Sequence, residues 1–308
     1  MVESPEKYDI VIIGGGPAGL SAGIYTARAR LNSLLIERGA IGGQIINTEW
    51  VENYPGFAEN ISGFDLTEAM HKQATKFGLE TLVADVAGIL KKGKHFIVKT
   101  SGGDLEAKAV IIAGGSERQK LGVPGEAEFT GKGVSYCATC DGPFFRDKEV
   151  AVVGGGNAAL TEAIELTRFA SKITVIHRRN ELRATKIMQE NAFAEKKIQI
   201  LWDSVLEEIS GDNFVGKVTV SNVKTQKKSV LDVSGVFMAV GFKPNTGYLK
   251  DIVKLDDNGA IITNERMETG TPGIFAAGDI RSGSIRQVIA AAGDGAVAAI
   301  GAERYISE

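Results

Sequence analysis

The strongest constraint on the fold is an internal repeat of a glycine-rich turn. The stretches "IVIIGGGPAGL" (residues 10–20) and "VAVVGGGNAAL" (residues 150–160) superpose when the sequence is shifted by 140 residues. In both copies a short apolar run precedes the glycines, and helix-forming residues follow them. A short apolar run is typical of a buried parallel strand, and the order strand, glycine turn, helix is typical of a βαβ unit. We therefore expect two related α/β units.

The first glycine turn fits a dinucleotide-binding fingerprint. Gly14 permits a tight turn, Gly16 lets a pyrophosphate approach the backbone, and Gly19 allows close packing of helix on strand. The next apolar strand, residues 33–36, ends at Glu37, where a carboxylate accepts hydrogen bonds from ribose hydroxyls. The phosphates would sit at the N-terminus of the helix. This ordered set predicts a dinucleotide site.

The second glycine turn differs from the first at the position that contacts the ribose. The shift that superposes the glycines carries Glu37 onto His177. Cations and fork-shaped guanidinium donors suit a 2′-phosphate, which an acid would repel. The second unit is therefore expected to bind NADPH in preference to NADH, and the alternative interpretation is a solvated basic helix start. The basic cluster consists of His177, Arg178 and Arg179, with Arg183 one helical turn further on.

A second pair of similar segments indicates how the two units are connected. "AVIIAGG" (residues 109–115) and "GVFMAVG" (residues 235–241) are both apolar strands that end in glycine, and a loop with a proline follows each. The chain is long for one domain. We expect an α/β fold of two Rossmann-like, three-layer dinucleotide-binding domains. The first would be discontinuous, residues 1–116 and 245–308, and the second would span 117–244. Two connections of this kind can act as a hinge.

Both cysteines of the chain lie in one stretch, "SYCATCDGPFF". A zinc site needs about four ligands, and the rest of the chain offers only three histidines, so we disfavour zinc. A redox pair needs one thiolate and a proton partner. Cys137 and Cys140 have the spacing of such a pair, and Asp141 is the adjacent titratable group. A turn role for the Asp-Gly dipeptide is compatible with this function.

The composition excludes several other classes of protein. The net charge of −3 shows no excess of positive charge of the kind that binds nucleic acid. No uninterrupted apolar run approaches the roughly 18 residues of a membrane-spanning helix. The start of the sequence lacks the apolar stretch of a secretory signal, and cysteine is scarce. We expect a cytoplasmic protein with neither nucleic acid nor membrane as a partner.

The ordered motifs together resemble those of the low-molecular-weight, bacterial and archaeal type of thioredoxin reductase. The matching elements are "GGGPAG", "GGQI", "VENYPGF", "YCATCDG", "GGGNAA", "HRR" and "GIFAAGD" followed by "RQV", and they cover essentially the whole chain. The resemblance implies a homodimeric flavoprotein that passes electrons from NADPH through FAD to an internal disulfide, and then to thioredoxin or a thioredoxin-like protein. One departure is "AGG" at residues 113–115, where the family commonly has Ala-Thr-Gly, which removes a hydroxyl near the FAD crossover.

The resemblance also implies roles for individual residues. Cys140 would be the sulfur next to the flavin, Cys137 the sulfur that attacks the partner's disulfide, and Asp141 the acid/base residue. Asp279 would bond the ribityl chain of FAD, although an N-cap role is the alternative for an aspartate after a strand. The remaining FAD positions are Gly14, Gly16, Gly19, Glu37, Gly43, Gln44, Asn53, Gln287 and Val288, and the NADPH positions are Gly156, Asn157, Arg178, Arg179 and Arg183.

Two alternatives to this function follow from the same residues. One is an enzyme of the same fold with a different acceptor, such as a peroxiredoxin-system or glutaredoxin-like protein, or with a ferredoxin or deazaflavin donor. The other is a non-catalytic redox sensor. We also hypothesise that the second domain rotates about its two connections, because it would carry both NADPH and the cysteines, which must each reach one flavin.

Overall fold

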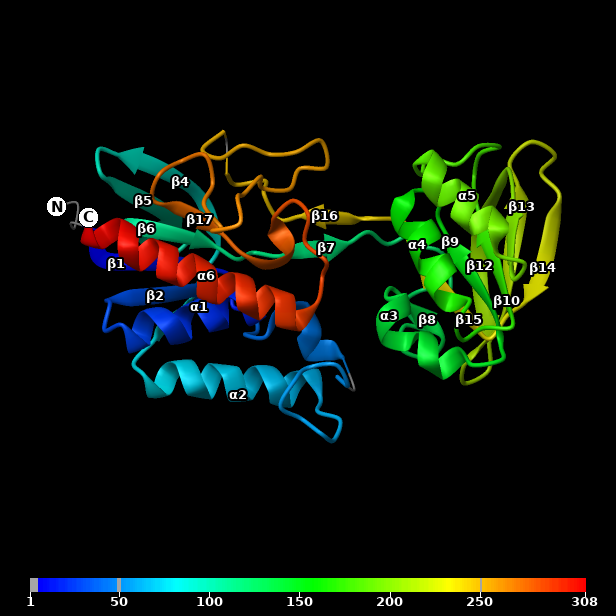
Figure 1. The fold of residues 1–308 in the computed structure, drawn as a ribbon, viewed down its shortest axis with the longest axis horizontal. Helices are drawn as coiled ribbons and strands as arrows, with labels where there is room; N and C mark the ends of the chain where they lie inside the picture. Colours follow the sequence, from blue (N-terminus) through cyan, green and yellow to red (C-terminus); the bar gives the residue numbers. More distant parts are fainter. Residues whose placement is uncertain (1–4, 49–50, 250) are drawn as a thin grey trace. The chain divides into compact units, whose positions relative to one another are not determined.

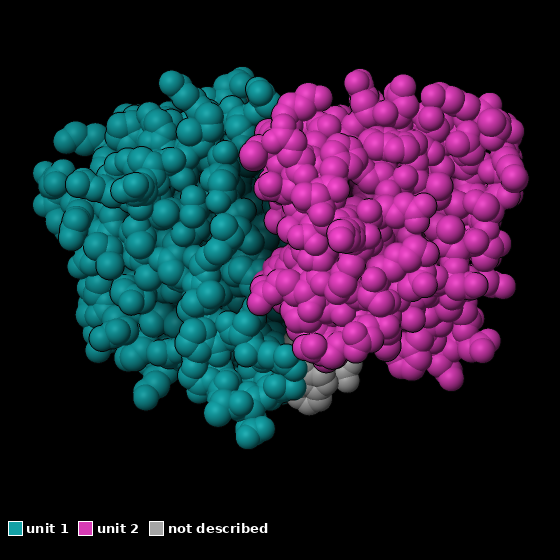
Figure 2. All heavy atoms as spheres, turned by 45° about the vertical axis from the view of Figure 1, so that its right-hand side comes forward, with its two compact units in different colours: residues 1–117, 243–308 teal, residues 118–242 magenta. Residues whose placement is uncertain are grey.

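The computed structural model describes residues 5–48, 51–249 and 251–308. The chain divides into two compact units, coloured separately in Figure 2. Unit 1 comprises residues 1–117 and 243–308, and unit 2 comprises residues 118–242. The chain thus leaves unit 1 after Glu117 and returns to it at Lys243.

Unit 1 is built on a mixed sheet with the strand order β3-β2-β1-β6-β5-β4, with β17 paired to β6. The pairs β1–β2, β1–β6, β2–β3 and β6–β17 are parallel, whereas the pairs β4–β5 and β5–β6 are antiparallel. The strands are β1 (Glu6–Ile13), β2 (Ser33–Glu37), β3 (Glu80–Val83), β4 (Val86–Lys92), β5 (His95–Thr100), β6 (Gly103–Ile112) and β17 (Ile274–Ala276). The helices are α1 (Pro17–Arg28), α2 (Gly63–Lys76) and α6 (Val288–Ser307), with 3₁₀ turns at Gly43–Asn47 and Gly278–Ile280.

Each face of this sheet buries its own apolar cluster. The helices α1, α2 and α6 cover one face, as Figure 1 shows, and pack against Ile10, Ile12 and Ile111. The opposite face buries Val11 and Ile13 against side chains of β4 and β5 and against Leu249, Val253 and Ile261. Burial on both faces explains why residues 10–13 of β1 form a continuous apolar run rather than an alternating one. The small residues of α6 allow close approach to α1, since a Cβ at Gly295 would overlap the carbonyl of Ala18.

Unit 2 contains two sheets. A parallel sheet has the order β11-β10-β9-β15-β8, and a separate antiparallel sheet has the order β12-β13-β14. The strands are β8 (Val134–Ser135), β9 (Glu149–Val153), β10 (Lys172–Ile176), β11 (Ile198–Leu201), β12 (Ser204–Gly211), β13 (Val215–Asn222), β14 (Lys228–Asp232) and β15 (Gly235–Met238). The helices are α3 (Ala138–Asp141), α4 (Asn157–Leu166) and α5 (Lys186–Ala194), and a 3₁₀ turn covers Gly142–Phe145.

The parallel sheet of unit 2 is the middle of three layers. On one face, Val150 and Val152 pack against the small and apolar side chains of α4, such as Ala159 and Leu166. On the other face, Ala151 and Val153 share a cluster with side chains of β12 and β13. The expected three-layer Rossmann-like arrangement is therefore confirmed, with an antiparallel sheet forming the third layer of this unit (Figure 1).

The two connections between the units pair with each other as short strands. They are β7 (Ser116–Arg118) and β16 (Phe242–Pro244), which form a two-stranded sheet. The apolar runs expected as strands each overlap a strand of the structure but differ from it in their bounds, because hydrophobic runs mark the buried part of a strand better than its solvated ends. In the described part of the chain, no helix has both the length and the apolar character needed to cross a bilayer.

Candidate functional site

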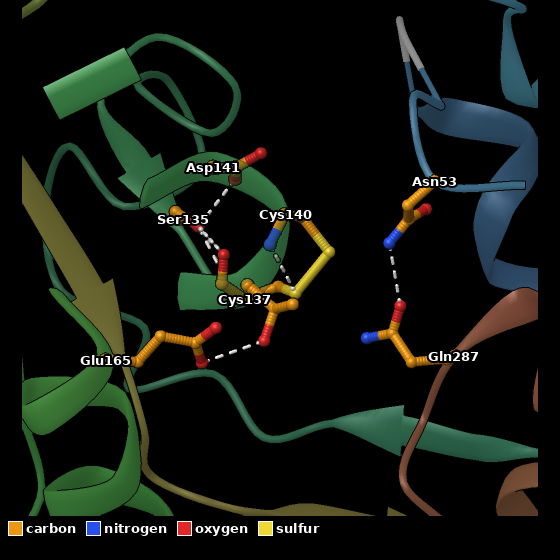
Figure 3. Close-up of a disulfide and its surroundings, with 8 residues drawn as sticks. Asn53, Ser135, Cys137, Cys140, Asp141, Glu165 and Gln287 are labelled. Atoms are coloured by element: carbon orange, nitrogen blue, oxygen red, sulfur yellow. Dashed lines mark hydrogen bonds between the residues drawn. A yellow bond between two sulfur atoms is a disulfide. The ribbon is translucent and has the colours of Figure 1, made fainter. Parts of the chain in front are cut away.

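The two cysteines form a disulfide on a short loop of unit 2 (Figure 3). Their Cα atoms are 5.4 Å apart. The strand β8 ends at Ser135, and α3 begins at Ala138, directly after Cys137. The Sγ atom of Cys137 accepts a hydrogen bond of 3.2 Å from the backbone N–H of Cys140. Cys137 is half-buried and Cys140 is exposed. The same N–H would be available to hydrogen-bond a thiolate at Cys137 once the disulfide is reduced.

A serine links the first cysteine to the neighbouring acid. The Ser135 hydroxyl donates to Oδ2 of Asp141 at 2.6 Å and accepts from the backbone N–H of Cys137 at 3.1 Å. Asp141 is the last residue of α3, and its N–H donates to the carbonyl of Cys137 at 3.1 Å. Asp141 therefore belongs to the same hydrogen-bonded loop as the disulfide, as Figure 3 shows.

Two further carboxylates flank this loop. The hydroxyl of Thr139, between the cysteines, donates to Oε2 of Glu165 on α4 at 2.9 Å. On the other side, the hydroxyl of Tyr136 donates to Oε1 of Glu126 at 2.9 Å. Glu126 is only 2% exposed, and its carboxylate also accepts from the backbone N–H of Gly122 at 2.7 Å. These contacts fix the residues on both sides of Cys137 to the rest of unit 2.

The first glycine turn joins β1 to α1 as expected. Gly14 has φ +111°, and a Cβ there would overlap the carbonyl of Ala113, the residue after β6. Gly19 packs against the carbonyl of Gly14, where no side chain would fit. The Glu37 carboxylate, at the end of β2, accepts from the backbone N–H of Gly15 at 2.7 Å and from that of Gly39 at 3.0 Å. Glu37 thus lies directly beside the glycine turn.

The other residues expected at this site come from distant segments of unit 1. Gly43 adopts φ +65°, and a Cβ there would lie 3.0 Å from the Cα of Gly16. Gln44 follows Gly43 in the same 3₁₀ turn and is exposed. The amide of Asn53 donates from Nδ2 to Oε1 of Gln287 at 3.0 Å, although 234 positions separate the two residues (Figure 3). Gln287 is the N-cap residue of α6, which starts at Val288.

Asp279 lies inside a 3₁₀ turn at the carboxyl end of β17 and is not an N-cap residue. Its Oδ1 accepts from the hydroxyl of Ser284 at 2.8 Å. The preceding Gly278 has φ +76°, and a Cβ there would lie 2.9 Å from the side chain of Ala18 on α1. This packing holds the Asp279 turn against the first turn of α1.

The second glycine turn joins β9 to α4. Gly154 turns the chain with φ +154°, and Gly156 is the N-cap residue of α4. Asn157, the first residue of the helix, accepts through Oδ1 from the backbone N–H of Thr185 at 2.7 Å. That bond fastens the helix start to the loop that follows β10. Here the basic residues lie in a loop rather than on a helix, because the next helix, α5, begins only at Lys186.

The basic cluster divides into one buried and three exposed side chains. His177 is 4% exposed, and its Nε2 lies 2.8 Å from the carbonyl of Glu181. A carbonyl can only accept, so Nε2 carries a proton, and the ring packs on Gly155. Arg178, Arg179 and Arg183 are exposed. None of the three forms an ion pair with another residue that the structure describes.

Both glycine turns have the geometry that a pyrophosphate needs. Neither α1 nor α4 has a side-chain cap at its N-terminus or an acid in its first turn. The N–H groups at those ends are therefore the natural donors for an anion. Beside Gly156 a Cβ would meet no atom within 4 Å, and beside Gly16 the nearest atom would be 3.8 Å away. The residues present thus fit a dinucleotide in each unit. In the described residues, no cluster of histidine, cysteine and acidic side chains fits a metal ion.

Comparison with known proteins agrees with this geometry. A family model for the pyridine nucleotide-disulphide oxidoreductases matches residues 8–295. The chain belongs to this family. Among its relatives, the thioredoxin reductase of Bacillus subtilis (strain 168) is 48% identical over 99% of this chain and 97% of its own length. The thioredoxin reductase of Listeria monocytogenes is 47% identical, with coverage of 100% and 97%. The crystal structure of thioredoxin reductase from Streptococcus pyogenes superposes with a TM-score of 0.92, at 48% identity and 99% coverage of both chains.

Sequence reasoning missed several residues that this family member places around its sites. They are Ser135, Thr139 and Glu165 beside the disulfide, and Arg281 and Asp294 beside Asp279. A serine two residues before a cysteine is a recognisable local motif, so Ser135 could have been proposed from the sequence. The partners Glu165 and Asp294 lie 26 and 13 positions away from theirs, and no local pattern predicts such contacts.

Proposed function

We propose that the protein is an NADPH-dependent flavoprotein that reduces the disulfide of thioredoxin or a thioredoxin-like protein. The observation that carries this proposal is the disulfide of Cys137 and Cys140, hydrogen-bonded to Asp141 through Ser135, in the same unit as a basic dinucleotide turn. The relatives named above support it, because they are thioredoxin reductases and match this chain over nearly their full length.

FAD is assigned to unit 1 and NADPH to unit 2. When bound, NADPH supplies a hydride, and FAD relays its two electrons to the disulfide. In unit 1, the N-terminus of α1 would bind the diphosphate, Glu37 the adenosine ribose, and Asp279 the ribityl chain. In unit 2, the N-terminus of α4 would bind the diphosphate. Arg178, Arg179 and Arg183 would bind the 2′-phosphate, since their exposed guanidinium groups have no acidic partner among the described residues.

Buried His177 has a different part from the three arginines. Its Nε2 proton is directed at the Glu181 carbonyl, and its ring packs on Gly155 of the glycine turn. We therefore assign to His177 the shaping of the nucleotide turn. We assign binding of the 2′-phosphate to the exposed arginines, which keep their charge at every physiological pH.

The reduced pair would act as a two-thiol reductant. Cys137 attacks one sulfur of the partner's disulfide as a thiolate, and a mixed disulfide forms while the other partner sulfur leaves and takes a proton. Cys140 then attacks Cys137, which releases the second partner thiol and restores the internal disulfide. The sum is one disulfide reduced and one formed, with two electrons and two protons transferred. Exposure alone would favour Cys140 as the attacking sulfur, but reactivity follows thiolate stability, which the N–H of Cys140 provides at Cys137.

The arrangement along the chain requires movement of one unit. The dithiol and the NADPH turn both belong to unit 2, whereas the FAD residues belong to unit 1. Both must approach FAD during one cycle, so we propose that unit 2 reorients about the paired strands β7 and β16. A covalent cross-link between the two units should stop turnover while leaving FAD bound. Full turnover by the cross-linked protein would contradict the movement.

We further propose that the protein is a cytoplasmic homodimer. Ile289, Val297 and Ile300 are exposed on α6, and their spacing places them on one face of that helix. Tyr25 of α1, the helix packed against α6, is exposed as well. Exposed apolar side chains gathered on one face are typical of a protein interface. Sedimentation equilibrium should give twice the chain mass, and Val297→Asp should shift it towards the monomer. A monomeric wild-type protein would exclude the dimer.

The function is tested by assaying NADPH oxidation with a panel of oxidised thioredoxin-like proteins. We expect steady turnover with at least one thioredoxin, together with formation of free thiols on it. Cys140→Ser should abolish this turnover while FAD remains bound. Bound FAD without turnover on any acceptor would contradict the proposal and favour a redox sensor.

A further inference from the structure

The hydroxyl of Ser135 has one proton and three polar neighbours. It accepts from the backbone N–H of Cys137 at 3.1 Å, and its own proton can reach Oδ2 of Asp141 at 2.6 Å or the carbonyl of Cys137 at 3.4 Å. The shorter distance and the charge of the acceptor favour donation to Asp141. One side chain therefore connects the backbone of the first cysteine to the acid beside the second.

Local backbone chemistry explains only part of this arrangement. Serine hydroxyls commonly accept from the N–H two residues further on, and the bond to Cys137 is of that kind. The bond to Asp141 spans six positions and is not part of the local motif. Ser135 is also only 4% exposed, and it lies on β8, where it is in register with Phe237 of β15. The hydroxyl thus belongs to an edge strand of the parallel sheet, while the loop that it contacts carries the disulfide.

We propose that Ser135 is a positioning residue for proton transfer at the dithiol. Its hydroxyl bonds both the carboxylate of Asp141 and the backbone N–H of Cys137, and it would so hold the acid at the first cysteine of the pair. This inference rests on the proposed function and names a further residue of the same site. Ser135 touches neither substrate nor cofactor in this account, and it acts only through Asp141.

The hydroxyl suits this task because it can serve both protonation states of the acid. When Asp141 is ionised, Ser135 donates to Oδ2. When Asp141 is protonated, the carboxylic O–H can donate to the serine oxygen, and the serine proton turns to the carbonyl of Cys137, the acceptor at 3.4 Å. The contact therefore persists while Asp141 gives a proton to a leaving thiolate and regains one. An alanine would leave the orientation of the carboxylate to the loop alone.

The proposal is tested with four variants of the FAD-loaded enzyme: Ser135→Ala, Ser135→Thr, Asp141→Asn and the double variant Ser135→Ala/Asp141→Asn. The assay measures kcat and KM for the disulfide partner with saturating NADPH. Ser221→Ala is the matched control, because Ser221 is also 4% exposed in unit 2 and its hydroxyl also bonds a carboxylate, that of Glu207. Thermal unfolding midpoints and FAD content of all variants report on folding.

Loss of positioning should lower kcat for Ser135→Ala by about 10- to 100-fold, with KM changed less than about twofold. Ser135→Thr should recover most of the lost kcat, since it restores a hydroxyl and threonine suits a strand. The double variant should turn over within about twofold of Asp141→Asn alone, because a serine that acts only through Asp141 has nothing left to position. Ser221→Ala should have wild-type kinetics.

The outcomes separate this inference from the proposed function. A wild-type enzyme that reduces no protein disulfide would contradict the proposed function itself. An active wild type with an equally active, folded Ser135→Ala variant would overturn the role of Ser135 alone. A double variant slower than Asp141→Asn by the full Ser135→Ala factor would also overturn it, because independent losses indicate that Ser135 only supports the loop. If Ser135→Thr fails to fold, the comparison of the double variant with Asp141→Asn still decides whether Ser135 acts through Asp141.

Discussion

The guanidinium of Arg281 and the carboxylate of Asp294 form a two-point ion pair behind the Asp279 turn. Nε of Arg281 lies 2.5 Å from Oδ2 of Asp294, and the second contact, to Oδ1, is 3.1 Å. Oδ2 also accepts from the backbone N–H of Gly278 at 3.1 Å. Asp294 is 9% exposed and belongs to α6, so the pair ties that helix to the turn that would bind FAD.

Removing one member of this pair should destabilise unit 1 and weaken FAD binding. Arg281→Ala leaves the Asp294 carboxylate buried and uncompensated, and we expect a loss of about 3 kcal/mol in the free energy of unfolding. The double variant Arg281→Ala/Asp294→Asn should lose less unfolding free energy than Arg281→Ala, because it has no unpaired buried charge. Chemical denaturation and FAD titration of the apoprotein measure both effects. A single variant as stable as the wild type would show that the pair contributes little.

The substitution Gly114→Ser should stabilise the protein. The phenol of Tyr248 is buried and has no hydrogen-bond partner among the described residues, and desolvation raises its pKa above the ordinary value. A Cβ at Gly114 would lie 3.5 Å from that phenol oxygen and 3.4 Å from Ile280, which leaves room for a small side chain. Gly114→Ser would supply a partner and remove flexibility from the unfolded chain. We expect a gain of about 1 kcal/mol, measured by chemical denaturation.

The neighbouring glycine is the matched control for this substitution. Gly115 has φ +63°, which serine tolerates poorly, so Gly115→Ser should destabilise the protein by about 1 kcal/mol. Equal effects of the two substitutions would contradict a role for the Tyr248 hydroxyl. In a Tyr248→Phe background, Gly114→Ser should raise the free energy of unfolding less than it does in the wild type.

The acid sensitivity of unit 1 should depend on Asp256. Burial opposes ionisation of this carboxyl, but hydrogen bonds from the Ser282 hydroxyl and from three backbone N–H groups outweigh it and lower its pKa below the usual range. A lowered pKa in the folded state means that ionised Asp256 stabilises the fold above its unfolded pKa. That contribution disappears as the pH falls through the lower, folded pKa. Asp256→Asn should therefore weaken the pH dependence of the free energy of unfolding below about pH 4. A variant with the same pH dependence as the wild type in that range would contradict this.

The exposed arginines of unit 2 should determine the choice of nicotinamide cofactor. Each guanidinium bonded to a 2′-phosphate contributes about 1.5–3 kcal/mol, so Arg179→Ala should raise KM for NADPH about tenfold or more. KM for NADH should change little, because NADH has no such phosphate. Arg266→Ala, an exposed arginine of unit 1, is the control. A parallel rise in KM for both cofactors would contradict direct recognition of the phosphate.

The sequence predicted those parts of the fold that local chemistry determines. The glycine turns at Gly14 and Gly154 were predictable because a tight turn and a close approach to the backbone leave few other residues. The apolar runs that became β1 and β9 were predictable because both faces of those strands are buried. The loop around Arg183 was expected as a helix, since its composition does not distinguish a solvated helix from a solvated loop.

The supporting contacts of the sites were not predictable, because they depend on how distant elements pack. Asn53 and Gln287 were each expected near the same site, but their mutual bond arises only when the segment before α2 meets the start of α6. Glu126 reads as an ordinary charged residue in the sequence, yet it is buried and accepts from Tyr136 and two backbone N–H groups. Tertiary structure brings such partners together without leaving a local pattern.

The central claim is that electrons from NADPH leave the protein through Cys137 and Cys140 as reduced partner thiols. The most direct measurement follows NADPH consumed and thiols formed in one reaction with oxidised thioredoxin. The account predicts one NADPH consumed for two thiols formed, and neither change with Cys140→Ser, while NADH supports much slower turnover. NADPH consumption without thiol formation, or thiol formation that survives in Cys140→Ser, would contradict it.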